Sequence, residues 1–269
     1  MPQALEFVEQ TRIDKNLSYN SVNVLRCALS AVIEPYKGTT FGEHPDTVLY
    51  MRGVFNQTPR VPKYEEIWDL NTVLEYLKKI SPARKLPLKS LTLKVATLFM
   101  VVTGQRAQTL SLLNVDNCQI QKHCILFVIQ ENVKQSRVGS AAMQIKLKQY
   151  APDPRLCIVN YMKEYLKRTK DIRSGSQLFI SFKRPFAPVQ KGTIAQWIKW
   201  VLGQAGINTS IFQGHSVRSA ACSKAARKGV PLNSILKQGG WRSASVFQAY
   251  YNKPLTKEKS EFMTSVLSK

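Results

Sequence analysis

The segment from Leu91 to Val102 constrains the fold most strongly, because it is apolar on nearly every side of a helix. A helix of this kind has to be covered all round by other elements. Ser90 is its predicted first residue, and Thr103-Gly104 its predicted end. A chain of 269 residues is long enough to build such a covering. We therefore predict a large domain in which this segment is the central, buried helix.

Apolar residues at helical spacing predict further helices around it. Asp69 is a predicted N-cap for one helix, and Arg106 lies at the start of another that runs from Ala107 to Leu113. Later helical patterns cover 156–167, 194–202 and 232–237. A further helix is predicted from His215 to a stop at Gly229, and a last one carries Val246, Phe247, Tyr250 and Tyr251.

Between these helices the apolar period changes. The segment from Cys118 to Ile129 is rich in β-branched and apolar residues, and 142–147 alternates between apolar and polar ones. Both patterns are typical of strands, and Leu178 to Phe182 reads as a further short strand. The sequence therefore predicts a mainly α fold with a small antiparallel β-sheet.

A separate helical region precedes this domain. Ser18 is a predicted N-cap in the first 56 residues, and Pro45 opens a second helical segment there. The stretch 57–63 then has two prolines, two basic residues and no apolar period, which indicates an extended linker. We therefore expect a small helical domain over 1–58, a linker over 59–64 and the large domain over 65–269.

The charge balance points to a polyanionic partner. Lys and Arg total 39 against 17 Asp and Glu, a formal net charge of +22. Nucleic acid is the commonest partner of such a surface, and a membrane surface is the alternative. No apolar run reaches transmembrane length. The five scattered cysteines indicate a reducing compartment, and neither they nor the three histidines show the spacing of a metal site.

Residues able to bind and attack a phosphodiester recur in the second half of the chain. His215 and Arg218 are three residues apart at a predicted helix start, so they lie on neighbouring turns of one face. Further candidates upstream and downstream are Arg106, Lys134, Trp241 after Gly240, and the pair Tyr250 and Tyr251. Two guanidiniums, an amine, an imidazole and a phenol are sufficient for this chemistry without a metal.

This set of motifs resembles the tyrosine recombinases of the phage-integrase family. The matching residues are Thr103-Gly104-Gln105-Arg106, Lys134, His215-Ser216-Val217-Arg218, Gly240-Trp241 and a terminal tyrosine. The motif sequences are most similar to those of the DIRS-like retrotransposon recombinases. The shared sequences are Thr-Gly-Gln-Arg, Lys-Gly-Val-Pro-Leu at 228–232 and the ending Phe247-x-x-Tyr250-Tyr251-x-Lys253-Pro254. The resemblance covers nearly the whole chain, with the catalytic domain starting near Tyr64.

The resemblance implies an enzyme that cleaves and rejoins DNA through a 3′-phosphotyrosine link, without metal or nucleotide cofactor. Arg106 and Arg218 would hold the phosphate oxygens, and Lys134 would protonate the departing 5′ oxygen. His215 would accept the proton of the nucleophile. Trp241 replaces a histidine of many relatives, and its indole can donate a hydrogen bond but cannot carry protons.

Two tyrosines compete for the role of nucleophile. The nine-residue step from Trp241 that is common in bacterial relatives points to Tyr250. Alignment on the Tyr-x-Lys-Pro ending of the DIRS-like group points to Tyr251, which we favour.

The family also implies partners and a location. The expected partners are double-stranded DNA and further copies of the chain, which form a tetramer on two DNA sites. The expected location is the nucleus, as in retroelements. The family's N-terminal clamp usually has four or more helices, whereas two or three are readable in 1–58, which indicates a truncated core-binding domain. The alternative is a catalytically inactive, domesticated DNA-binding module, since Leu232 to Tyr251 also reads as helix-turn-helix. A topoisomerase-like nicking activity is a third possibility.

Overall fold

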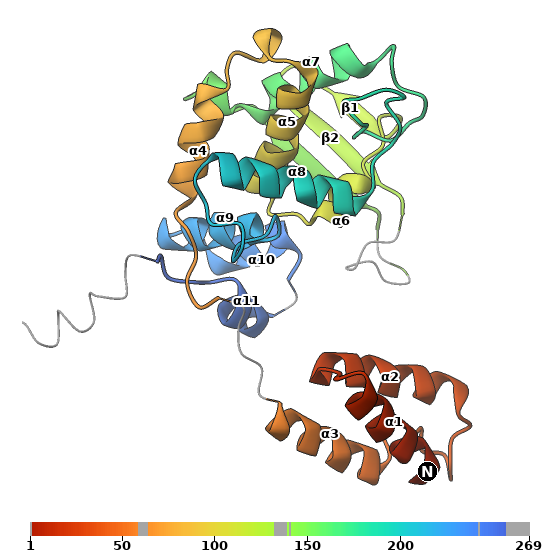
Figure 1. Cartoon of the computed structure of the whole chain (residues 1–269). Helices are drawn as coiled ribbons and strands as arrows, with labels where there is room; N and C mark the ends of the chain where they lie inside the picture. Colours follow the sequence, from red (N-terminus) through yellow and green to blue (C-terminus); the bar gives the residue numbers. More distant parts are fainter. Residues whose placement is uncertain (1, 59–63, 132–138, 140, 242, 257–269) are drawn as a thin grey trace, which may run out of the picture. The chain divides into compact units, whose positions relative to one another are not determined.

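The computed structural model describes residues 2–58, 64–131, 139, 141–241 and 243–256 (Figure 1). The chain divides into two compact units, Met1–Pro62 and Lys63–Lys269. The described residues contain eleven α-helices and one three-stranded sheet. None of these helices has both the length and the apolar content that crossing a membrane requires. The predicted linker over 59–64 lies almost wholly outside the described residues.

The first unit is a small helical cluster made of α1 (Pro2–Asp14), α2 (Tyr19–Val32) and α3 (Pro45–Gln57). Both predicted helix starts are confirmed, since the Ser18 hydroxyl accepts the Ser21 N–H at 3.4 Å and Pro45 opens α3. The buried core of the unit is small: Val8, Val22, Phe41, Met51 and Val54.

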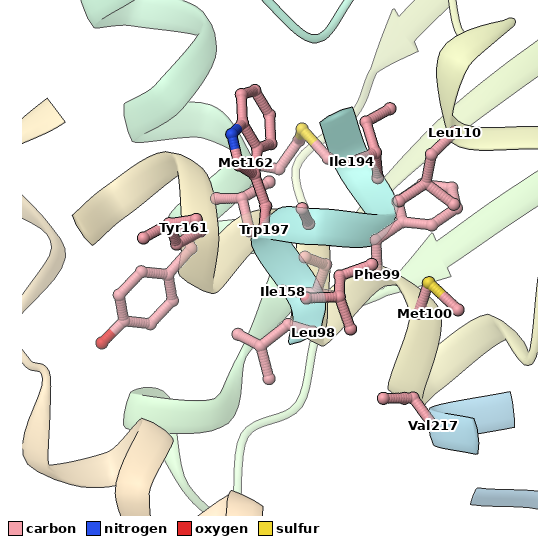
Figure 2. Packing of buried hydrophobic residues seen from close by; sticks show 14 of the residues in the cluster. Leu98, Phe99, Met100, Leu110, Ile158, Tyr161, Met162, Ile194, Trp197 and Val217 are labelled. Carbon is pink, nitrogen blue, oxygen red and sulfur yellow. The ribbon is translucent and has the colours of Figure 1, made fainter. Parts of the chain in front are cut away.

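The second unit is built around α5 (Leu88–Thr103), which is buried along most of its length. The helices α7 (Ile158–Thr169), α8 (Lys191–Gln204) and α9 (Ser216–Arg227) all pack against it. Figure 2 shows Phe99 of α5 among side chains from α7 and α8. The prediction of a central buried helix is confirmed. Its start is corrected from Ser90 to Leu88, because Pro87 is the residue that fixes an extended backbone before the first turn.

Two shorter helices complete this part of the unit. Asp69 caps α4 (Leu70–Lys79) as predicted, because its carboxylate accepts the Asn71 N–H at 2.9 Å. Arg106 is the N-cap residue of α6 (Ala107–Ser111), which ends two residues earlier than predicted. Short 3₁₀ helices lie at Ala83–Lys85 and Pro154–Leu156.

The sheet consists of β1 (Cys118–Ile120), β2 (Cys124–Ile129) and β3 (Met143–Lys148), antiparallel in the order β1-β2-β3. On β3, Ile145 and Leu147 are buried while the intervening polar residues are exposed, as alternation predicts. The buried side chains face the core with α5 and α7. The mainly α fold with a small antiparallel sheet is therefore confirmed.

The strand predicted at Leu178 to Phe182 is wrong for the described residues. This stretch is extended, but it forms only the isolated bridges Asn114↔Gln177 and Ile180↔Pro188. Its backbone changes partner within a few residues, since the Leu178 N–H donates to Leu113 O at 2.7 Å and Phe179 O accepts from Val189 N–H at 3.2 Å. No single neighbour runs beside it long enough to form a ladder.

The C-terminal part of the unit packs α9 with α10 (Leu232–Gly239) and α11 (Ala244–Tyr250). Gly229 and Gly240 have positive φ angles of 77° and 69° at the two breaks, as the glycine stops predicted. Beyond α11, residues 252–256 run beside Ile67.

Candidate active site

Arg218 is the centre of the candidate site, on the first turn of α9 and fully buried. Its guanidinium donates to the backbone oxygens of Gly104 and Gly239, the latter at 2.6 Å. The guanidinium carbon lies 3.8 Å from the ring centroid of Trp241 and 5.2 Å from that of Tyr251. Arg218 therefore joins the ends of α5 and α10 to the two aromatic residues predicted from the motifs.

The electrostatic environment of Arg218 is cationic. Burial, and after it the neighbouring charge of Arg106, lowers its pKa to about 10. A group with this pKa is still protonated near neutral pH. No carboxylate of the described residues forms an ion pair with either arginine. The pair thus presents uncompensated positive charge, which favours an anionic ligand.

Arg106 reaches this cluster because the chain reverses just before it. Gly104 ends α5 in the left-handed region at φ 62°, and Arg106 is extended before α6 begins. Gln105, between them, donates to Gln238 O at 2.8 Å and so connects this turn to α10. The Nη1 atom of Arg106 is buried and has no hydrogen-bond partner among the described residues.

Trp241 follows the left-handed Gly240, and its ring lies close against Gly239. A Cβ added at Gly239 would lie 1.9 Å from the Trp241 ring, so only glycine allows this approach. The indole Nε1 is buried and, within the described residues, has no acceptor. The role of the indole as a hydrogen-bond donor to phosphate stays a prediction.

Tyr251 faces the same cluster. Its hydroxyl lies 3.4 Å from His215 Nε2, and its ring centroid lies 4.7 Å from that of Trp241. Tyr250 is the last residue of α11 and is 52% exposed. The structure therefore brings Tyr251, and not Tyr250, into contact with the other predicted residues.

The five predicted site residues within the described part of the chain form one connected cluster: Arg106, His215, Arg218, Trp241 and Tyr251. Lys134 lies outside the described residues, and its role stays a prediction. The described part of the chain also holds no group of three or more His, Cys, Asp or Glu residues able to bind a metal ion.

Three buried N–H donors of this cluster lack an acceptor within the described residues: Arg106 Nη1, Arg218 Nε and Trp241 Nε1. An unsatisfied buried donor costs about 1–3 kcal/mol, and more when it is charged. A tetrahedral oxyanion carries several acceptor oxygens and negative charge, so it can satisfy donors that approach from different segments. The arrangement therefore suits a phosphate group bound beside the Tyr251 hydroxyl.

Several residues that support the site were not predicted. Trp68 donates its buried indole N–H to Ser216 Oγ at 2.9 Å, across 148 positions of sequence. Ser219 and Ser223 both donate to the backbone oxygen of Tyr251. The two serines are four positions apart on a predicted helix, which is a weak signal of a shared face. The Trp68 contact has no local sequence signal, because it depends on the packing of distant segments.

Comparison with known proteins identifies the family. The family model described as the phage integrase family matches residues 69–257, more than half of the chain. The chain belongs to the phage integrase family. The family predicted from the motifs, that of the tyrosine recombinases, is thereby confirmed. A comparison with curated proteins finds no significant match.

Solved structures of this family share the fold. The XerH site-specific recombinase, in a post-cleavage complex with palindromic difH substrate, aligns with a TM-score of 0.61 and 14% identity over 99% of this chain and 72% of that one. The Tn1549 transposon integrase, in complex with transposon right-end DNA, aligns with a TM-score of 0.57 and 14% identity over 99% of this chain and 84% of that one. XerA recombinase aligns with a TM-score of 0.54 and 16% identity over 98% of this chain and 82% of that one.

Proposed function

We propose that this integrase-family protein is a site-specific recombinase that cleaves and rejoins DNA strands through a 3′-phosphotyrosine link. One observation carries the proposal. Three buried donors that lack an acceptor among the described residues belong to the same cluster as a tyrosine whose hydroxyl lies 3.4 Å from an imidazole nitrogen. A phosphate acceptor and a phenol nucleophile are the two groups that this arrangement accommodates.

In the proposed reaction the Tyr251 oxygen forms a bond to the scissile phosphorus, and the bond from phosphorus to the 5′ oxygen breaks. His215 takes the phenol proton, and Lys134 supplies a proton to the departing 5′ oxygen. The hydroxyl of a second strand then attacks the phosphotyrosine and reverses these transfers. One phosphoester is exchanged for another, so the reaction requires no nucleotide to supply energy and no metal to generate the nucleophile.

The proposed roles of the arginines follow from the charge that develops in this reaction. Negative charge accumulates on the non-bridging oxygens in the transition state, and preorganised donors that face those oxygens lower the barrier. Arg106 and Arg218 would supply charged donors. Trp241 would supply one neutral donor, and its stacking on the Arg218 guanidinium would hold that group in place.

Duplex DNA is the proposed substrate, and the net charge of +22 supports it. Recombination of two duplexes requires four strand cleavages. Because each protomer has one such tyrosine, we propose a tetramer on two DNA sites. We propose that the first unit acts as a DNA clamp.

We also propose that the protein belongs to the DIRS-like retroelement recombinases and resides in the nucleus. The Thr-Gly-Gln-Arg sequence that ends at Arg106 and the Tyr-x-Lys-Pro ending after Tyr251 support this assignment. A fluorescent fusion expressed in a eukaryotic cell should accumulate in the nucleus, and a uniform cytoplasmic signal would contradict the location.

A suicide substrate tests the proposed function. A nicked DNA duplex that loses the short fragment bearing the new 5′ hydroxyl after cleavage should trap the protein as a denaturant-resistant adduct. The Tyr251→Phe variant should give no adduct, whereas Tyr250→Phe should retain it. Retarded DNA without any adduct would instead favour the inactive DNA-binding module. Because the target sequence is unknown, the substrates should be drawn from a library of random core sequences, with adducts selected and sequenced.

A further inference from the structure

The main chain of Tyr251 is held from one side by α9. Its backbone oxygen accepts hydrogen bonds from Ser219 Oγ at 3.0 Å and from Ser223 Oγ at 2.6 Å. The two serines are one helical turn apart, so a single carbonyl can lie between them. Ser219 also directly follows Arg218, which means that one helix carries both the central arginine and the residues that fix the tyrosine.

Lys253 holds the same segment from the other side. Its backbone N–H donates to Ser223 Oγ at 3.0 Å, so the Ser223 hydroxyl both donates and accepts. Its ammonium donates to the backbone oxygen of Tyr64 at 2.8 Å and lies 5.3 Å from the Tyr64 ring centroid. Lys253 therefore connects the tyrosine segment to the first described residues of the second unit.

The following residues extend this connection. The Ile67 N–H donates to Pro254 O at 2.8 Å, and the Thr256 N–H donates to Ile67 O at 3.2 Å, which makes a short parallel bridge. Ile67 is fully buried, and the adjacent Trp68 is hydrogen-bonded to Ser216 of α9. The segment against which the tyrosine is held is thus itself anchored in the core.

Tyr251 needs such support because α11 ends at Tyr250. A residue beyond a helix end has no helical partner for its carbonyl, so its orientation depends on other contacts. A nucleophile has to approach its target within narrow limits, and a misplacement of about 1 Å can reduce a rate by about a hundredfold. Contacts that fix the Tyr251 backbone therefore act on the alignment of its phenol.

We propose that Ser223 and Lys253 are positioning residues that fasten the nucleophilic Tyr251 to α9 and to the segment from Tyr64 to Ile67. This inference rests on the proposed function, since it takes Tyr251 as the attacking group. Neither residue contacts the phosphate in this proposal. They act through the Tyr251 main chain.

The kinetic test uses the full chain and the suicide substrate at saturating DNA. Ser223→Ala and Lys253→Met should each slow adduct formation by about ten- to a hundredfold, with the affinity for DNA unchanged. Lys253→Arg keeps a donor for Tyr64 and should recover most of the rate. Lys224→Met is the matched control, because Lys224 also joins α9 to another segment, through Asn71 at 2.5 Å, but does not contact the tyrosine segment. Wild-type rates in both Ser223→Ala and Lys253→Met would overturn the proposal.

A spectroscopic test separates positioning from cleavage. With 3-fluorotyrosine in place of Tyr251, the fluorine resonance of the DNA-free protein should shift or broaden in Ser223→Ala and Lys253→Met and stay unchanged in Lys224→Met. If the fluorine responds but no variant, wild type included, forms an adduct, the contacts are supported and the recombinase proposal fails. If wild type forms the adduct and the fluorine resonance is unchanged in both Ser223→Ala and Lys253→Met, the positioning role is refuted while the recombinase proposal stands. Melting temperatures within a few degrees of wild type exclude simple unfolding.

Discussion

Replacing Arg218 by lysine should be far from conservative, although the charge is retained. The guanidinium donates to two backbone oxygens, Gly104 O and Gly239 O, and stacks on Trp241 while Nε remains unpaired. A lysine has a single nitrogen and cannot hold these positions together. Loss of a preorganised donor typically costs about 2.7–4 kcal/mol of transition-state stabilisation, so Arg218→Lys should cleave roughly a hundred- to a thousandfold more slowly.

The same surroundings should make the residual activity of Arg218→Lys depend on pH. In this site the arginine pKa falls from 12.5 to about 10, mainly through burial and then through the charge of Arg106. An equal depression applied to the ordinary lysine pKa of about 10.4 places the new ammonium near 8. Its charge is then present at pH 7 and mostly lost at pH 9. The rate of the variant divided by that of wild type should fall roughly tenfold over this range.

The measurement is single-turnover adduct formation on the suicide substrate, at saturating DNA, from pH 6.5 to 9.5. Dividing by the wild-type rate at each pH removes the contribution of groups that titrate in both proteins. Arg218→Met, which has no charge at any pH, is the control and should give a flat ratio. A flat ratio for Arg218→Lys, or a rate near wild type, would refute the account of Arg218 as a buried, charged phosphate ligand.

Other consequences concern the core and the supports of the site. Lys94 is fully buried and its pKa is lowered by burial to about 7. The unfolded chain therefore binds more protons above pH 7, and unfolding free energy should rise by roughly 3–5 kcal/mol towards pH 10.5, a rise that Lys94→Met should lack in chemical denaturation. Gly239→Ala, whose Cβ would overlap the Trp241 ring, should lose about 1–3 kcal/mol of stability together with adduct formation. Trp68→Phe should cost about 1–2 kcal/mol in the same denaturation assay, because Ser216 loses its buried donor. An unchanged denaturation midpoint in Gly239→Ala or in Trp68→Phe would contradict the prediction for that variant. A rise of the unfolding free energy with pH in Lys94→Met that equals the rise in wild type would contradict the prediction for Lys94.

The helices of this protein were predictable because their signals are local. Ser18 and Asp69 cap helices through their own side chains, and Gly104 ends α5 in a conformation that glycine adopts readily. The stretch from Leu178 to Phe182 was mistaken for a strand because its apolar, β-branched composition shows only that it is extended and buried. Whether an extended stretch forms a ladder depends on a neighbour elsewhere in the chain.

The candidate site was predictable as a set of side chains but not as a structure. Motif order grouped Arg106, His215 and Arg218, which lie in one cluster of the structure. Motif order could not show that the Arg218 guanidinium donates hydrogen bonds to two backbone oxygens, nor that serines of α9 donate to the backbone oxygen of Tyr251. Those contacts join segments more than twenty residues apart, and they become visible only when the packing of α9 and α10 is known.

The contacts of Arg218 explain how a site with unpaired donors remains ordered without its ligand. Two of its nitrogens bond the ends of α5 and α10, so the position of the guanidinium is set by the fold and does not depend on a bound anion. Among the described residues Arg218 Nε has no partner and is available to an incoming oxygen, as are Arg106 Nη1 and Trp241 Nε1. Donors fixed in this way need no reorganisation when charge develops on a phosphate. In the proposed reaction Arg218 is therefore both a structural crosslink and a phosphate ligand, so its substitution must be judged by the pH dependence of the reaction and not by activity loss alone.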